Sequence, residues 1–402
     1  MKIIVSILVL VINTVSGVVT ERSKLYLYEV GTLPTFGYSV LWEENTLFMG
    51  SIRSNTDSSI NTGAVYVFNK LNEQWVQTDH FWPSDVQRGD FFGYSISKIS
   101  DLMIVGAPQE SNVEVFSGAA YVFQHNGNEW IQISKLKSEL PIRYEFFGHT
   151  VHENNDRIMV GSTKGIYEFR VNDGVWTMSD FLSSSNPSDS YFFSFDAKDN
   201  VMVTADMSDS TLGYRNGSVY LFELKNDSWV NTEQLFPSVM QEDISFGYSV
   251  AFDGDRIAVG AIRSYINGPE SGSVYIFEKV NGNWVETNII HPAVPEEHMF
   301  FGFSLFLDEN KLLVGAPGNA IEDANSYVFE FHLVDSTWIQ TAVYQSSNVD
   351  PQDRFGTKVT QRGSEVLVTA TGAFDEDEQA FAAYFFDNDF IFASGFNQLN
   401  EP

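Results

Sequence analysis

Apolar and polar residues alternate in short runs along most of the chain, and residues 246–289 give one complete example. Two alternating runs are joined by the pair Asp253-Gly254, and after a loop two further runs follow at 272–277 and 284–289. Alternation with a period of two places one side of each run against a core, and Asp-Gly favours a tight hairpin turn. This segment is therefore predicted to form four antiparallel β-strands.

The four-strand pattern recurs with fixed internal distances. The pair Phe-Gly, which begins the first strand, is found at Phe36-Gly37, Phe92-Gly93, Phe147-Gly148, Phe246-Gly247, Phe301-Gly302 and Phe355-Gly356. Thirteen residues after each Phe comes an apolar residue before a small one, at Met49-Gly50, Val105-Gly106, Val160-Gly161, Val259-Gly260, Val314-Gly315 and Val368-Thr369. Six tryptophans stand seven residues after one Phe and seventeen before another: Trp75, Trp130, Trp176, Trp229, Trp284 and Trp338. Two spacings held constant six times indicate an internal repeat of one supersecondary unit.

One sheet of about 55 residues cannot bury both of its faces alone. Neighbouring sheets must cover them, so the seven modules are predicted to form an all-β, seven-bladed β-propeller of four-stranded antiparallel blades. Either 24–29 or 390–393 could supply the outer strand of blade seven. The N-terminal segment is favoured, because it precedes the first Phe-Gly just as a fourth strand precedes the others. A ring closed in this way has no exposed sheet edge at the junction.

Two modules depart from the pattern. Module four has Phe193-Ser194 in place of Phe-Gly, and its hairpin reaches Val203 three residues early. Module seven has Phe390 where a tryptophan is expected. In the other modules, the repeated glycines are expected where inner strands crowd together, and the repeated Phe and Trp side chains are expected to pack between adjacent sheets.

The composition is that of a chain with a large packed core, since 43% of its 402 residues are hydrophobic and 15% are aromatic. Residues 1–17 are predicted to be a secretory signal, because the charged start Met1-Lys2 precedes an apolar run from Ile3 to Ile12 that is too short to span a membrane. Residues 18–402 are predicted to form a single secreted domain.

The charge and the absence of cysteine exclude several kinds of function. A chain without cysteine cannot use a thiolate nucleophile or bind zinc through cysteine. The net charge of −30 argues against nucleic acid and anionic membrane surfaces as partners. An acidic coat that keeps the protein soluble is the simpler interpretation of the charge.

With Phe-Gly followed by Val-Gly-Ala-Pro, complete at Val105–Pro108 and Val314–Pro317, residues 24–395 resemble the FG-GAP repeat family. That family includes the seven-bladed propeller of integrin alpha chains and many secreted repeat proteins. The resemblance implies a binding platform, but it does not specify the ligand.

Integrin-type members of the family often bind calcium in the first hairpin through spaced carboxylates. Calcium needs six to eight oxygen ligands, and the hairpin turns of this chain, such as Asp253-Gly254-Asp255, are too short to supply them. Neither a metal site nor another cofactor is therefore expected. The chain is more similar to the secreted, non-integrin members.

The connection between the second and third strands is the segment whose length varies. It measures 17 to 19 residues from the Val-Gly position to the third-strand Phe in six modules, but only nine in module three, from Val160 to Phe169. These connections are expected to share one face with the connections between modules, and that face is the predicted binding surface. The candidate ligand-binding residues, which combine arginines for acidic groups with tyrosines for sugars, are Arg53, Arg263, Tyr265, Tyr214 and Arg215.

Other short motifs lie in predicted turns. Two Asn-x-Ser sequons, at Asn216 and Asn226, are candidate glycosylation sites. The tripeptide Arg88–Asp90, which integrins recognise, adjoins a buried-looking Phe pair and is interpreted as a chance match. The acidic loops 321–323 and 375–378 are interpreted as solvated charge.

No arrangement typical of an enzyme is found. The seven histidines are scattered, and His149 and His152 should point in opposite directions from one strand. The predicted innermost strands carry an apolar residue four positions after their Phe, which suggests a dry filling around the axis: Ile96, Val151, Val250, Leu305 and Val359. The favoured function is therefore a non-enzymatic extracellular platform for a protein or carbohydrate ligand. A propeller hydrolase or lyase with a central site, and a self-assembling surface or matrix protein, remain alternatives.

Overall fold

A computed structural model describes residues 17–19, 21–27, 35–55, 61–154, 156–183, 194–319, 324–347, 353–372 and 380–387. Several sequence predictions fall outside these residues: the signal segment up to residue 16, Phe193, the acidic loops 321–323 and 375–378, and the alternative closing segment 390–393.

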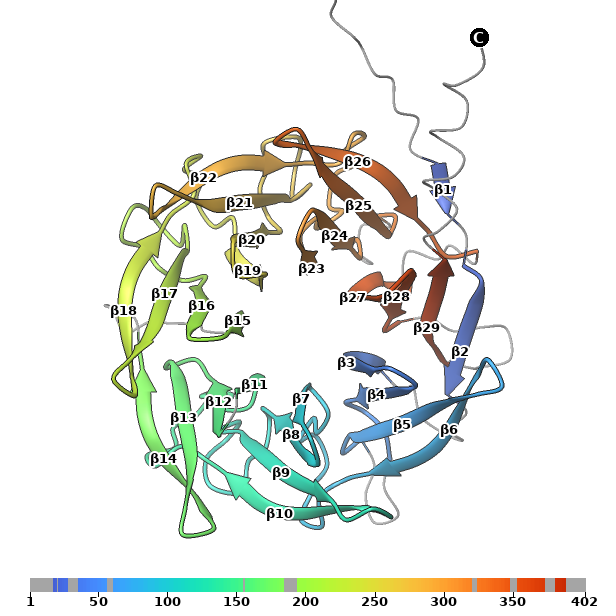
Figure 1. The fold of residues 1–402 in the computed structure, drawn as a ribbon, viewed down its shortest axis with the longest axis vertical. Coiled ribbons are helices and arrows are strands. Elements are labelled where there is room, and N and C mark those ends of the chain that lie inside the picture. The colour runs from blue at the N-terminus through green and yellow to red at the C-terminus, as the bar shows by residue number, and fades with distance from the viewer. Residues whose placement is uncertain are drawn as a thin grey trace, which may run out of the picture.

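The described residues form seven antiparallel four-stranded sheets arranged as blades around a central axis, and this confirms the predicted β-propeller (Figure 1). In blades one to five the strands follow one another outwards in chain order, so the first strand is innermost. Blades six and seven keep this order from β23 to β26 and from β27 to β29.

The blades are built from consecutive strands. Blade one contains β3 (Phe36–Glu43), β4 (Thr46–Ser51), β5 (Ala64–Leu71) and β6 (Gln74–Phe81). Blade two contains β7 (Ser95–Ile99), β8 (Leu102–Ala107), β9 (Ala119–His125) and β10 (Trp130–Leu136). Blade three contains β11 (Thr150–Asn154), β12 (Arg157–Gly161), β13 (Ile166–Asn172) and β14 (Val175–Leu182). Blade four contains β15 (Ser194–Lys198), β16 (Val201–Asp206), β17 (Ser218–Lys225) and β18 (Ser228–Leu235).

The second half of the ring repeats this order. Blade five contains β19 (Phe246–Phe252), β20 (Arg256–Ala261), β21 (Ser273–Val280) and β22 (Asn283–Ile290). Blade six contains β23 (Ser304–Asp308), β24 (Lys311–Ala316), β25 (Tyr327–Val334) and β26 (Thr337–Tyr344). Blade seven contains β27 (Phe355–Arg362), β28 (Glu365–Ala370), β29 (Ala380–Asp387) and the N-terminal β2 (Ser23–Leu27).

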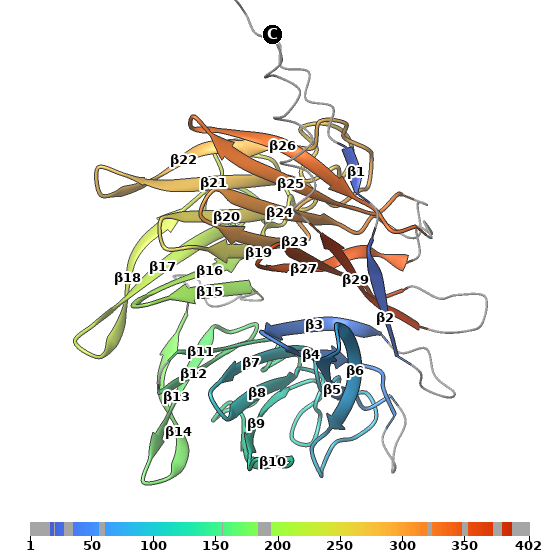
Figure 2. The ribbon, with the colours of Figure 1, turned by 45° about the vertical axis from the view of Figure 1, so that its right-hand side comes forward.

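The N-terminal segment closes the ring, as predicted. β2 pairs antiparallel with β29 (Figure 2). Arg22 donates to Asp387 at 2.7 Å, which also ties the segment to blade seven. A second contact was not predicted: β1 (Gly17–Val19) pairs in parallel with β26 and adds a fifth strand to blade six. The N-terminal residues therefore connect two neighbouring blades.

Aromatic side chains fill the space between adjacent blades, which confirms their predicted role. Phe36, the first residue of β3, is completely buried and meets Phe68 of the same blade edge-on at 5.6 Å. Trp75 in blade one stacks on Phe385 in blade seven at 5.7 Å. Each core is shared by two blades, so no blade is independent of its neighbours.

In blades one, two, five and six the inner strands approach the next blade so closely that only glycine fits at the crossing point: Gly50, Gly106, Gly260 and Gly315. A Cβ added at Gly106 would lie 1.9 Å from the carbonyl oxygen of Gly148 in the next blade. The Ser95 hydroxyl donates to that same oxygen at 2.9 Å. Equivalent serines at Ser39, Ser249 and Ser304 make the same bond to the next blade.

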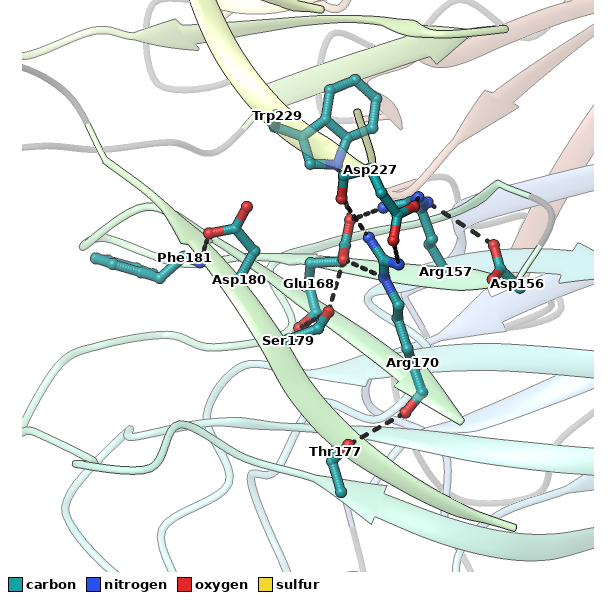
Figure 3. A network of polar contacts seen from close by, with 10 residues as sticks. All are labelled: Asp156, Arg157, Glu168, Arg170, Thr177, Ser179, Asp180, Phe181, Asp227 and Trp229. Atoms are coloured by element: carbon teal, nitrogen blue, oxygen red, sulfur yellow. Dashed lines mark hydrogen bonds and ion pairs between the residues drawn. The ribbon is translucent and has the colours of Figure 1, made fainter. Parts of the chain in front are cut away.

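Polar side chains link blades three and four (Figure 3). The fully buried carboxylate of Glu168 accepts hydrogen bonds from Arg157 at 2.8 Å and from Arg170 at 2.7 Å. Trp229 of blade four donates to the same carboxylate at 2.8 Å. Burial alone would raise the pKa of Glu168, but its hydrogen bonds outweigh that effect and lower the pKa. The network is saturated by its own partners, so its role is structural.

Candidate functional site

One face of the ring, here named the loop face, carries the connections between second and third strands together with the connections between blades. Backbone hydrogen bonds join the two kinds of connection, as from Phe92 N to Thr62 O at 3.1 Å and from Phe147 N to Ser117 O at 3.0 Å. The prediction that both kinds share a face is therefore confirmed.

The short connection predicted in blade three is also confirmed. Only residues 162–165 separate β12 from β13. Beside this connection the loops of blades two and three leave apolar side chains exposed: Leu140 is 79% exposed, and Val113, Ile142 and Tyr144 are also exposed. An exposed apolar patch of this kind on a loop face is typical of an interaction surface.

Four of the five predicted ligand-binding residues lie on neighbouring loops of blades four and five. Arg215 and Arg263 are on either side of Asp243, at 3.7 and 3.4 Å from its carboxylate oxygens. Tyr214 and Tyr265 adjoin the two arginines in sequence and are 63% and 51% exposed. Through Asp243, the two arginines connect loops that lie about one repeat apart in the sequence.

Further charged contacts extend from Arg263 to the connection between blades five and six. Arg263 Nε lies 3.5 Å from Glu270, whose other carboxylate oxygen is 3.2 Å from His298 Nδ1. We name Arg215, Asp243, Arg263, Glu270 and His298 the rim cluster. Its side chains are about a third to a half exposed, so its ion pairs contribute little stability and can exchange for contacts with a ligand. Tyr265 and Glu270 also line a shallow, open depression with Gly268 and Pro269.

Arg53 does not join this group. It is exposed on the loop of blade one, and Figure 1 shows blades one and five on opposite sides of the ring. The matching sequence positions of Arg53 and Arg263 are therefore equivalent in the repeat but distant in space.

A second set of side chains surrounds the axis at the loop-face end of the inner strands. It occupies the position two residues after the repeated Phe, and we name it the axial girdle: Tyr38, Tyr94, His149, Tyr248 and Phe303. The Tyr38 hydroxyl donates to the Tyr94 hydroxyl at 2.9 Å, and the Tyr94 hydroxyl is 2.7 Å from His149 Nε2. Across the ring, Tyr248 and Phe303 have ring centroids 4.8 Å apart.

The girdle tyrosines are half-buried. This is expected for side chains around the axis of a ring, where the surrounding blades exclude much of the water. Loss of water around them raises the pKa of Tyr38, Tyr94 and Tyr248. The charge of Arg354 acts in the opposite direction on the pKa of Tyr38 and of Tyr248. The three phenols therefore stay neutral and able to donate hydrogen bonds at neutral pH.

The prediction that five apolar side chains fill the space around the axis is wrong. The side chains assigned to it pack instead in the cores between blades: Ile96, Val151, Val250, Leu305 and Val359. Successive side chains of a strand point to the two faces of its sheet, and neighbouring blades cover both faces. The sequence has an aromatic residue two positions after the repeated Phe in most modules, and this pattern could have predicted the girdle.

The inner strands also carry ionisable groups. Asp196 on β15 pairs with Val203 at a register position that holds Ala251 in blade five, and burial raises the pKa of Asp196 to about 6. Burial lowers the pKa of His152 to about 4 and raises the pKa of Glu153 to about 7. His152 packs against Phe195 rather than beside His149, so the two histidines make separate contacts.

The other sequence motifs differ in accessibility. Asp90 of the Arg-Gly-Asp tripeptide is 4% exposed and accepts a hydrogen bond from Gln87 N at 2.7 Å, so its carboxylate is turned inward. Asn216 is 3% exposed and its Nδ2 donates to Gln241 O at 3.0 Å, which leaves no room for a glycan in this conformation. Asn226 is exposed in the turn between β17 and β18, so it is the accessible sequon.

Within the described residues, no group of three or more His, Asp and Glu side chains is arranged to hold a metal ion. No described segment forms an apolar helix long enough to cross a membrane.

Comparison with known proteins identifies the repeat. Residues 75–123 and 229–277 match the family model of the FG-GAP repeat. Each matched segment begins at a repeated tryptophan and ends at the third-strand Phe of the next blade, so both matches have the same register in the repeat. No curated protein matches the chain. The two matches and the ring of seven four-stranded blades together show that the chain is an FG-GAP repeat β-propeller.

Proposed function

We propose that this propeller is a non-enzymatic extracellular binding platform, which recognises a protein or carbohydrate ligand through the loop face. The inner and middle strands form a rigid scaffold, while the loops that differ in length and chemistry gather on one face. The extracellular setting rests on the signal-like segment 1–17.

The observation that carries the proposal is the rim cluster. Arg215 and Arg263 are held beside one exposed carboxylate, with Tyr214 and Tyr265 exposed next to them. Arginine and tyrosine dominate the energetics of many interfaces, because they combine a large contact area with directed hydrogen bonds. The exposed apolar side chains near Leu140 supply a second surface on the same face.

The test is a binding screen of the purified protein against panels of cell-surface proteins and glycans. Any hit is measured again with the double variant R215A/R263A, and we expect binding to weaken at least tenfold. Arg362 is an exposed arginine at the end of β27, beside the turn to β28 on the opposite face, and it supplies the matched control R362A. A hit that R362A weakens as much as R215A/R263A does would contradict the loop-face assignment.

Variant R53A reports how far the ligand extends. If the ligand covers only blades four and five, R53A binds like the wild type. If the ligand spans the ring, R53A and R215A/R263A each weaken binding, because the two sites are on opposite sides of the loop face.

A hydrolase or lyase with a site at the axis is a second candidate. The observation that favours it is the pair of inner-strand carboxyl groups, Asp196 and Glu153, whose pKa values burial raises to about 6 and about 7. A raised pKa is what a general acid needs near neutral pH. Turnover of any glycan in the screen, abolished by D196N or E153Q but retained by R215A/R263A, would favour this function over the platform.

A further inference from the structure

Blade seven differs from the other blades at the axis. Thr357 stands at the girdle position and is buried, so this blade adds no ring to the girdle. The next residue is serine in four blades, where it bonds to the neighbouring blade, but it is Lys358 in blade seven. Lys358 is exposed although Thr357 and Val359 on either side are buried. Because β27 is innermost and is flanked by β3 and β23, the exposed side chain faces the axis.

Arg354, a second cation of blade seven, contacts the girdle. Arg354 precedes the repeated Phe, at the position of Phe300 in blade six, and its Cζ lies 5.7 Å from the ring of Phe303. Among the described residues no carboxylate forms an ion pair with Arg354 or Lys358. Loss of water alone lowers the pKa of Lys358, which is expected of an ammonium group without a nearby counter-charge.

Arg354 and Lys358 are two cations on the inner side of blade seven without an ion-pair partner among the described residues. In a chain with net charge −30 they create a local preference for an anion. The Tyr94 hydroxyl accepts from Tyr38, and it can donate to an anion when His149 Nε2 carries a proton. The guanidinium of Arg354 matches the geometry of a carboxylate or sulfate. The half-buried rings of Tyr248 and Phe303 add an aromatic surface of the kind that packs against the apolar face of a sugar ring. An acidic peptide side chain would use the cations but not the aromatic rings.

We propose that the axial girdle, together with Arg354 and Lys358, binds one acidic group of a carbohydrate ligand. This inference rests on the proposed binding function, and it names the chemistry of the ligand: an oligosaccharide that carries a uronic acid or a sulfate. The rim cluster then contacts the remainder of the ligand.

The test uses the intact protein and two matched probes, a tetrasaccharide that contains glucuronate and the same tetrasaccharide with its carboxyl groups reduced to alcohols. We expect isothermal titration calorimetry to show at least tenfold tighter binding of the acidic probe, with affinity falling as salt is added. A sulfated tetrasaccharide distinguishes the two acidic groups.

The variants replace each cation by the residue that another blade carries at the same position. K358S introduces the serine of four other blades, and R354S introduces the equivalent of Ser245, so both are expected to fold. In the double variant R354S/K358S, the acidic probe should bind no more tightly than the reduced probe. In the wild type, tyrosine ring resonances should shift with the acidic probe, which tests the site without any substitution.

Several outcomes would overturn the inference. Equal binding of the acidic and reduced probes, no binding of either, or unchanged binding in R354S/K358S would each exclude an acid site at the axis. Tighter binding of an oligoglutamate peptide would exclude a carbohydrate as the ligand. If a screened ligand is lost in R215A/R263A but not in R354S/K358S, the loop-face function stands and only the axial assignment fails.

Discussion

Buried carboxyl groups in this protein have raised or lowered pKa values according to the partners that the neighbouring strands supply. Glu330 on β25 is fully buried, yet it is surrounded by His332 at 2.7 Å, Lys311 at 3.0 Å and the hydroxyl of Tyr344. Burial alone would raise the pKa of Glu330, but these hydrogen bonds and the charge of Lys311 outweigh it and lower the pKa to about 2. Burial of Asp196 outweighs its hydrogen bonds from the backbone amides of Ala197 and Phe252, so its pKa is raised instead.

The lowered pKa of Glu330 predicts a contribution to acid stability. A carboxyl group with a pKa of 4.5 when unfolded and about 2 when folded stabilises the native state above pH 4.5, and this stabilisation is lost as the pH falls towards 2. Variant E330Q should lose about 3 kcal/mol of unfolding free energy at pH 7, because it leaves buried cations without their partner. The measurement is urea unfolding at pH 7 and pH 3.

At pH 3 the difference between E330Q and the wild type should be smaller than at pH 7. An equal difference at both values would contradict the assigned pKa. The exposed Glu309 supplies the control E309Q, which should change the unfolding free energy by less than about 0.5 kcal/mol at either pH.

At the scale of elements, the ring depends on one short strand from the far end of the chain. β2 lies beside β29, and Leu25 is buried with Ala383 and Phe385 in the core shared by blades seven and one. Arg22 and Lys70 both contact Glu365, which adds charged contacts at the same junction. The strand that completes blade seven thus also contributes to the core between blades seven and one, where the ring closes.

Truncation of Leu25 tests this closure. L25A should cost about 2–4 kcal/mol of unfolding free energy, because it leaves a cavity in a core that only β2 can fill. Hydrogen exchange of the β29 amides should accelerate, since their partners on β2 would detach first. L71A, at an exposed leucine that ends β5, should change neither quantity measurably. Unchanged exchange of β29 in L25A would mean that β2 is dispensable for closure.

At the scale of the whole molecule, the apolar cores lie between blades and each is built from two of them. One core combines Tyr275 of blade five with Val219 of blade four, and another combines Phe331 of blade six with Ile276 of blade five. A blade that unfolds exposes the cores on both of its sides, so the ring should be lost as a unit.

We therefore predict a single unfolding transition. The tryptophans lie at the junctions between blades, so their fluorescence reports tertiary packing around the ring, while far-ultraviolet circular dichroism reports the strands. In urea the two signals should have the same midpoint within error. Added salt should raise that midpoint, because it screens repulsion within a chain of net charge −30. Two separate midpoints would show that blades unfold independently.

The sequence by itself determined the fold of this protein. The constant distances between Phe-Gly, Val-Gly and Trp repeat a local pattern of strands and turns, and each pattern is complete within one module. The same pattern favoured the N-terminal segment as the closing strand, because residues 24–29 precede the first Phe-Gly just as a fourth strand precedes the others.

Only the tertiary structure decided which side chains meet. Arg215, Asp243 and Arg263 come from three different loops, and Tyr38, Tyr94 and His149 come from three different blades. The repeat shows which residues are equivalent from module to module. Equivalent residues lie in different blades and are therefore spread around the ring, as Arg53 in blade one and Arg263 in blade five are. The same limit explains the wrong prediction for the axis. Period-two alternation reports that a side chain faces a core, but not whether that core lies at the axis or between two blades.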